Sequence, residues 1–171
     1  EGLGATPTKV TGSVNGESLA FENYRLPKLG TQFALDGKEA RVEIPSLVLG
    51  DGNQIALKAT MMMQDAMPVK AEWSVVITDP AKLIETTGLP KPPKPVAVKL
   101  DLKGKADFAV KDLSDGALEK LLADLTLNVS EGIFGDSVLP SIALEVRAKD
   151  GEARLTPCSI RFDDENHLEL S

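Results

Sequence analysis

The sequence predicts an all-β protein with one or two short helices, in which an elongated, curved antiparallel sheet forms a groove or an open sandwich. Three observations carry this prediction. Apolar and polar residues alternate through most of the chain, Asp-Gly dipeptides separate the alternating runs, and the sequence repeats itself after about 113 residues. With 171 residues, of which 42% are hydrophobic, the chain is long enough to bury a core.

Alternating stretches identify the strands. In "VKAEWSVVI" (69–77), every second residue from Val69 to Ile77 is apolar, and the polar residues Lys70, Glu72 and Ser74 alternate with the first four of them. Strands of this kind have one apolar and one polar face, which is typical of an antiparallel sheet that meets solvent on one side. The same alternation runs through residues 55–63, 96–103, 106–110 and 121–129.

Turn signals separate these runs. Asp-Gly and Asn-Gly dipeptides favour the left-handed backbone of tight hairpins, and a Lys-Gly-Lys sequence indicates a turn between two alternating runs. We therefore expect turns at Asn15-Gly16, Asp36-Gly37, Asp51-Gly52, Lys103-Gly104-Lys105, residues 132–137 and Asp150-Gly151.

One clear helix interrupts the strands. Asp79 is a good N-cap, Pro80 suits the first helical position, and Gly88 can end the helix. Leu83 and Ile84 form its short apolar side. A second helical turn near 115–121 is an alternative to the start of a strand at that point.

The proline-rich residues 89–95 are the best domain boundary, because four prolines force extended backbone and forbid regular pairing. We expect a β-repeat unit at 1–88 that ends in the helix, a link at 89–95, and a second β-unit at 96–171.

The internal repeat is visible when residues 14–58 are laid on 127–171 without a gap. Eleven of the forty-five aligned positions are identical, whereas ordinary residue frequencies give roughly three. We interpret this as a genuine repeat. A tandem duplication of an ordinary β-sandwich, or a hairpin pattern that arose twice by chance, remain the alternatives.

A change of phase occurs inside each copy of the repeat. Ala40 and Val42 share a parity, whereas Leu47 and Leu49 continue on the opposite parity. The change falls at residues 45–46, and the second copy changes phase at the equivalent place. A β-bulge or a sharp bend produces such a change, so we expect one in both copies.

Composition limits the classes of partner. The formal net charge of −7 argues against nucleic acid and disfavours electrostatic docking on anionic lipid headgroups. The single cysteine, Cys158, cannot form an internal disulfide. The sequence has no continuous apolar stretch long enough to span a membrane.

No set of residues indicates catalysis. His167 is the only histidine, and we expect it to face solvent; we expect Cys158 to be a buried or edge thiol. Residues 51–53 and 163–166 resemble fragments of a calcium loop but lack its spacing, and a hairpin turn explains both. We expect no enzyme, no metal and no cofactor.

Residues 77–113 resemble the recurring segment of AsmA-like and TamB-like proteins of the bacterial envelope. In that segment a short helix of the form D-x-x-x-L-x-x-x-x-G-L precedes a proline-rich turn and strands of the form x-L-x-L-x-G-x-x-x-x-L-x-x-L. The matching positions here are Asp79, Leu83, Gly88, Leu89, Pro90, Pro92, Pro93, Leu100, Gly104, Phe108 and Leu113.

This resemblance implies a non-catalytic, periplasmic β-groove that binds or conducts the acyl chains of phospholipids in lipid transport or outer-membrane biogenesis. It also implies a tether to the inner membrane, and we expect that anchor only outside this fragment. The chemistry of the chain is compatible with this, because few aromatic residues (4%) leave a mainly aliphatic lining. The alternative is a structural or protein-interaction β-repeat with a closed core and no ligand.

The apolar positions of the alternating strands are the candidate lipid-facing residues. We expect the following side chains to face lipid: Val42, Leu47, Leu49, Ile55, Leu57, Trp73, Val75, Leu100, Phe108, Leu125, Leu127, Leu155, Ile160, Phe162 and Leu168. For any one of them, packing in the dry core of a sandwich is the simpler interpretation.

Overall fold

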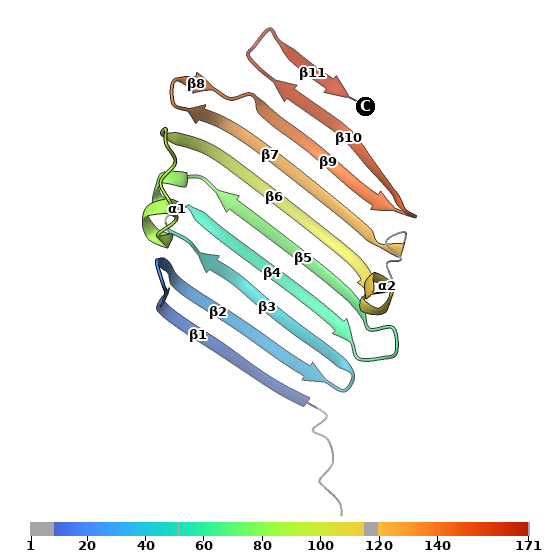
Figure 1. Cartoon of the computed structure of the whole chain (residues 1–171). Helices are drawn as coiled ribbons and strands as arrows, with labels where there is room; N and C mark the ends of the chain where they lie inside the picture. Colours follow the sequence, from blue (N-terminus) through green and yellow to red (C-terminus); the bar gives the residue numbers. More distant parts are fainter. Residues whose placement is uncertain (1–8, 51, 115–119, 171) are drawn as a thin grey trace, which may run out of the picture.

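The computed structural model describes residues 9–50, 52–114 and 120–170, and it shows one open antiparallel sheet with two short helices (Figure 1). The strands are β1 Lys9–Phe21, β2 Tyr24–Asp36, β3 Glu39–Val48, β4 Asn53–Met62, β5 Pro68–Ile77, β6 Val96–Ala109, β7 Leu122–Phe134, β8 Ser137–Val138, β9 Ser141–Lys149, β10 Glu152–Arg161 and β11 His167–Leu170. The helices are α1 Pro80–Thr87 and α2 Val110–Ser114.

The sheet is a meander, in which strands that follow each other along the chain also pair with each other. Its order is β1-β2-β3-β4-β5-β6-β7-β9-β10-β11, and the short strand β8 pairs only with β7 among the described strands. β1 and β11 lie at opposite edges and do not pair with one another, so the sheet stays open (Figure 1). The prediction of an antiparallel, open β-architecture is confirmed. The prediction left open a groove or an open sandwich; the described strands form a single layer and not a sandwich.

The repeat is present in the strands themselves. β1 and β7 have bounds that differ by 113 residues at both ends, and so do β3 and β10. Backbone conformation follows the same shift. Ser18 and Glu131 both have positive φ, at 53° and 51°, and Gly37 and Asp150 have φ of 59° and 55°. The two stretches therefore share strand bounds and turn conformation, except that the continuous strand β2 corresponds to two strands, β8 and β9, in the second copy.

The predicted change of phase is a β-bulge in both copies. The pairing of β3 with β4 shifts register between Ile44 and Leu47. The pairing of β9 with β10 shifts between Leu155 and Cys158. Because of the bulge, the apolar residues after it point to the same face of the sheet as the apolar residues before it, although their positions in the sequence have the opposite parity.

Helix α1 has the predicted caps. The carboxylate of Asp79 accepts the backbone N–H of Lys82 at 2.9 Å, and Gly88 ends the helix with a left-handed φ of 75°. The N–H of Gly88 donates to the carbonyl of Ile84. This local chemistry explains why a helix forms between two long strands.

Two predicted turns are wrong. Asn15 and Gly16 lie within β1, where they pair with Gly30 and Leu29, and the chain turns later, at residues 22–23. Residues 103–105 lie within β6, which continues to Ala109. In both places the glycine does not bend the backbone but leaves room for the side chain of another residue. A Cβ at Gly16 would stand 2.8 Å from Leu19 Cδ1, and a Cβ at Gly104 would stand only 2.2 Å from Trp73 Cζ2.

The other turn predictions agree with the structure as far as it extends. The chain turns at Gly37, at Gly52, at residues 135–136 and at Asp150-Gly151. Asp51 and most of the helical turn predicted near 115–121 lie outside the described residues.

The proline-rich link joins α1 to β6 without separating two sheets. β5 and β6 pair along the whole of β5, from Pro68 to Ile77. The division of the chain into two units with a boundary at 89–95 therefore remains a prediction from the repeat.

Candidate site: the apolar face of the sheet

Strand register places the apolar side chains in rows that cross the sheet. Paired residues of neighbouring strands point to the same face, as do residues i and i+2 of one strand. Leu57 pairs with Trp73, Trp73 with Gly104, and Gly104 with Leu125. The row continues through the pair of Leu125 with Val146. Each alternating run thus contributes to one continuous apolar face.

Five such rows lie side by side. Neighbouring strands are about 4.8 Å apart and residues i and i+2 about 6.7 Å apart, so the rows that cross from β3 to β10 are about 29 Å long and the five rows together span about 27 Å along the strands. Only the three middle rows cross all of these strands; the first row starts at β5 and the last ends at β6, so the face is slanted. The first two rows are Ile77, Leu100, Val129, Ile142, Ile160, Leu168 and Leu47, Ile55, Val75, Leu102, Leu127, Leu144, Cys158, Leu170. The other three are Ile44, Leu57, Trp73, Gly104, Leu125, Val146, Leu155; Phe33, Val42, Ala59, Ala71, Ala106, Ala123, Ala148, Ala153; and Val10, Leu35, Ala40, Met61, Val69, Phe108.

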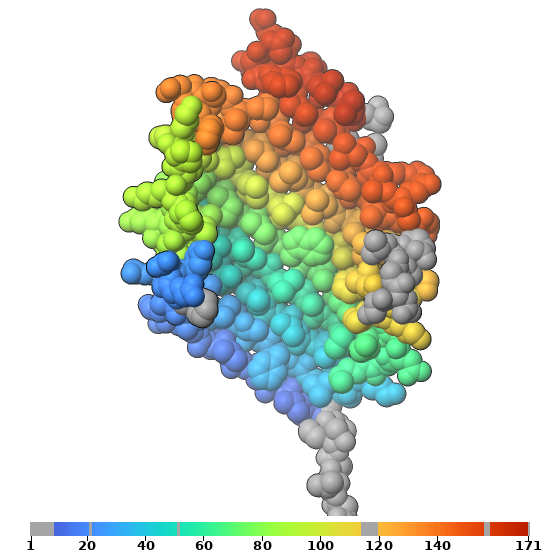
Figure 2. Space-filling model, in the orientation of Figure 1, coloured from blue at the N-terminus to red at the C-terminus, as the bar shows by residue number. Residues whose placement is uncertain are grey.

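No second layer of the described chain covers this face. Among the described apolar residues only Cys158, at 6% exposure, is buried, whereas Val42, Leu155 and Leu168 are each more than 40% exposed. The chain has 12034 Å² of accessible surface, and a compact protein of this size would have about 8,100 Å². Figure 2 shows the strands side by side with no layer across the middle of the sheet.

Thirteen of the fifteen predicted lipid-facing residues lie in these rows. The other two, Leu49 and Phe162, lie just beyond the ends of β3 and β10. Their backbone N–H groups close the next turns by donating to the carbonyls of Asn53 and Asn166, each at 2.9 Å. The register therefore brings together apolar residues that are far apart in the chain. That lipid covers them stays a prediction.

Several residues of the face were not among the predicted positions. Ile44, Leu102, Leu144 and Val146 occupy the second and third of the five rows. The same alternation identifies them, but only the pairing between strands shows that they lie in the middle of the face and not at its margin.

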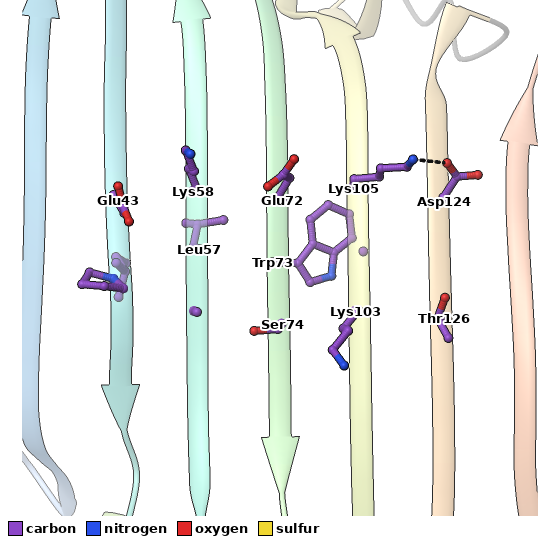
Figure 3. A pocket seen from close by; sticks show the side chains of 14 residues that line it. Glu43, Leu57, Lys58, Glu72, Trp73, Ser74, Lys103, Lys105, Asp124 and Thr126 are labelled. Carbon is purple, nitrogen blue, oxygen red and sulfur yellow. Dashed lines mark ion pairs between the residues drawn. The ribbon is translucent and has the colours of Figure 1, made fainter.

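Trp73 is the largest side chain at the centre of the face. Its indole lies over β6 at Gly104, and it extends from β5 towards β6 in Figure 3. Phe33 lies over Gly12 of β1 in the same way, with its ring 2.2 Å from the place of a Cβ there. An aromatic ring opposite a cross-strand glycine packs on bare backbone, so each pair keeps a large ring flat against the sheet.

The opposite face carries a charge ladder, which consists of Glu43, Lys58, Glu72, Lys105, Asp124 and Arg147 in consecutive strands. Positive and negative groups alternate across the row. Lys105 and Arg147 form ion pairs with Asp124 at 3.1 Å and 2.8 Å. Opposite charges on directly facing positions favour the observed register, because a one-residue slip would destroy every pair.

The ladder changes the acidity of one of its members. The side-chain hydrogen bond from Arg147, and then the one from Lys105, hold the pKa of Asp124 below its ordinary value. Asp124 therefore stays ionised at neutral pH and keeps both partners in place.

A shallow depression on the sheet is lined by three consecutive cross-strand rows (Figure 3). Two of these rows carry polar-face side chains, including Ser74, Thr126 and most of the charge ladder. Its charged lining residues are Lys58, Lys103, Lys105, Glu43, Glu72 and Asp124, three of each sign. The depression thus has no net charge with which to attract an ion.

Helix α1 is attached to the sheet at one end of the strands (Figure 1). Asn53 is 1% exposed and opposes Ile77 on the apolar face. Its Nδ2 donates to the carbonyl of Asp79 at 2.8 Å, and its Oδ1 accepts the backbone N–H groups of Thr78 and Asp79, each at 3.1 Å. One side chain thus joins the β3–β4 hairpin to the start of α1, and α1 borders the apolar face there.

The two residues considered for catalysis have structural surroundings. Cys158 is buried and lies in a row of the apolar face, opposite Leu144 and Leu170. His167 is exposed and pairs with Arg161 at the edge of the sheet. Within residues 9–50, 52–114 and 120–170 there is no group of three His, Cys, Asp or Glu side chains arranged to hold a metal ion.

Neither described helix is long and apolar enough to cross a membrane. Comparisons with protein-family models, curated proteins and solved structures found no match to this chain.

Proposed function

We propose that this protein is a non-catalytic module that binds lipid acyl chains on its apolar face. The observation that carries the proposal is a continuous, slanted aliphatic face of five rows, about 27 Å along the strands, that no described part of the chain covers. Apolar surface of that extent is costly in water, and soluble proteins bury such patches against a partner or a ligand.

The chemistry of the face suits flexible chains. It consists mainly of Val, Leu, Ile and Ala, with the indole of Trp73 held flat at its centre. It has no row of aromatic rings that would stack on a planar ligand. The resemblance to AsmA-like and TamB-like proteins supports the same function, and with it a periplasmic setting and a role in lipid transport.

A second candidate is a structural or protein-interaction β-repeat, whose apolar face packs against another protein layer. One observation favours it. The three middle rows run uninterrupted across seven strands from β3 to β10, and obligate protein interfaces have a continuous apolar centre of this kind. The two candidates make opposite predictions about what the purified chain carries.

Lipid extraction followed by mass spectrometry tests the proposal directly. We expect reproducible, co-purifying phospholipid. Trp73, the only tryptophan in the chain, adds a position-specific measurement, because lipids with brominated acyl chains should quench its fluorescence. In the matched control, Trp73→Phe is combined with Val76→Trp, which moves the tryptophan to the polar face of the same strand. Quenching should then disappear.

A pair of variants separates ligand binding from folding. Leu127→Glu places a charge in the central rows of the apolar face, whereas Thr126→Glu places the same charge on the polar face, one residue away in β7. We expect Leu127→Glu to lose bound lipid and Thr126→Glu to keep it, while both retain the β-type circular dichroism spectrum. A lipid-free wild-type chain whose Trp73 is not quenched would refute the proposal.

A further inference from the structure

The most exposed apolar side chain among the described residues lies away from the apolar face, in the hairpin between β7 and β8. Val138 is 77% exposed. Ile133, Phe134 and Leu139 around it are 44%, 39% and 38% exposed. We call residues 133–139 the β7–β8 tip. It projects at the same end of the strands as α1 (Figure 1). Four exposed apolar side chains within seven residues give this turn a small apolar surface of its own.

The backbone around the tip holds these side chains outward. The N–H of Gly135 donates to the carbonyl of Pro95 at 2.9 Å, and the N–H of Leu139 donates to the carbonyl of Gly132 at 2.8 Å. Ile133 and Val138 are paired, so their side chains lie next to each other on one face of the hairpin. The tip is therefore a braced apolar surface, which has already lost much of the conformational freedom that binding would otherwise restrict.

A cationic group lies beside this surface. The Lys94 ammonium is 5.9 Å from the centre of the Phe134 ring, and the Lys94 side chain crosses the turn at Gly135. The tip itself has one acidic residue, Asp136. The tip thus combines aliphatic and aromatic side chains with a lysine whose charged end can reach outward.

We propose that the β7–β8 tip docks the protein on the surface of a phospholipid bilayer. Ile133 and Val138 point to the polar side of the sheet and Phe134 to the side of the apolar face, so the tip inserts end-on into the boundary between headgroups and acyl chains. The ammonium of Lys94 meets a lipid phosphate. The chain has a net charge of −7, so apolar insertion and not overall electrostatic attraction drives docking. This inference goes beyond the lipid-binding proposal and does not depend on it, because it concerns the end of one hairpin and not the rows of the apolar face.

Flotation of the full chain with small unilamellar phosphatidylcholine vesicles tests the proposal. We expect the wild type to float, and to do so almost equally at low and high salt. Val138→Asp should lower the vesicle partition coefficient about tenfold or more, because it removes one well-exposed apolar side chain and adds a charge. Asp136→Asn should raise it. Met63→Asp is the matched control, since Met63 is 51% exposed in the β4–β5 hairpin at the other end of the strands.

Two results would overturn the inference: a wild type that stays at the bottom of the gradient, or equal losses for Val138→Asp and Met63→Asp. Binding to a protein partner without any vesicle binding would count against it in the same way. The Leu127→Glu variant keeps the two proposals apart. It should still float if the tip docks the protein, even though it no longer carries lipid.

Discussion

The contact between Trp73 and Gly104 gives the most exact test of how the apolar face is built. Replacing Gly104 by Ala adds a Cβ that would stand 2.2 Å from Cζ2 and 2.3 Å from Cε2 of the indole. No pair of non-bonded carbon atoms tolerates such a distance, so the indole has to leave its position over β6.

The expected cost follows from two opposing terms. Overpacking of this kind costs about 1–3 kcal/mol, and the gain from replacing glycine by alanine inside a strand is about 0.5–1 kcal/mol. The uncovered face lets the indole swing aside, which keeps the overpacking cost below the top of its range, at about 1.5–2.5 kcal/mol. We therefore expect Gly104→Ala to lower the free energy of unfolding by about 0.5–2 kcal/mol.

Urea unfolding followed by far-ultraviolet circular dichroism measures this change, and the midpoint should fall by roughly half a molar. Gly30→Ala in β2 is the control, because the nearest atom to its new Cβ is Asn15 Oδ1 at 3.3 Å. That variant should be neutral or slightly more stable than the wild type.

A double-mutant cycle identifies the cause. In a Trp73→Ala background the clash is absent, so Gly104→Ala should become stabilising by about 0.5–1 kcal/mol. If Gly104→Ala is as stable as the wild type, and its effect is the same with and without the indole, the packing of Trp73 on Gly104 is not what keeps glycine at this position.

Three further predictions concern other parts of the sheet. Asn53→Ala removes the partner of two backbone N–H groups and one carbonyl, so it should lower the free energy of unfolding by about 1–3 kcal/mol and speed hydrogen exchange in α1. As a control, Asn166→Ala in the exposed β10–β11 turn should lower it clearly less. The pKa of Asp124 lies below its ordinary value, so its stabilising contribution is present above about pH 4 and is lost as the pH falls through the lowered pKa. Arg147→Met should raise the pKa of Asp124 in an NMR titration. An unchanged titration midpoint would show that the ion pair with Arg147 does not lower this pKa. Cys158 is 6% exposed, and a maleimide should modify it roughly tenfold more slowly in the folded chain than in urea.

Local sequence patterns were sufficient for most of the fold. Alternation of period two predicted the strands, Asp79 and Gly88 predicted the ends of α1, and a change of parity predicted both bulges. Each of these features is determined by residues within a few positions of one another. The pattern also predicted which residues share the apolar face, because alternation fixes the side of the sheet once the strand is known.

The two wrong turns show what local patterns lack. Glycine favours a turn in isolation, but at Gly104 it is present because an indole from the neighbouring strand occupies the space of its side chain. Asn53 is similar. It resembles an ordinary turn residue after Gly52, yet it is buried because Thr78 and Asp79, some 25 residues later, bind its side chain. In both cases the deciding partner is distant in sequence.

The cover of the apolar face is the one feature that the pattern leaves open, and the reason is physical. Alternation gives every strand an apolar side, and the charge ladder keeps the other side in water, but neither specifies what meets the apolar side. In a sandwich a second sheet of the same chain supplies that contact. The described strands form a single meander, and α1 and α2, with 8 and 5 residues, reach only its ends. The described strands therefore supply no core of that kind, and the chemistry of what meets the apolar side is what separates an acyl-chain carrier from a protein-binding repeat.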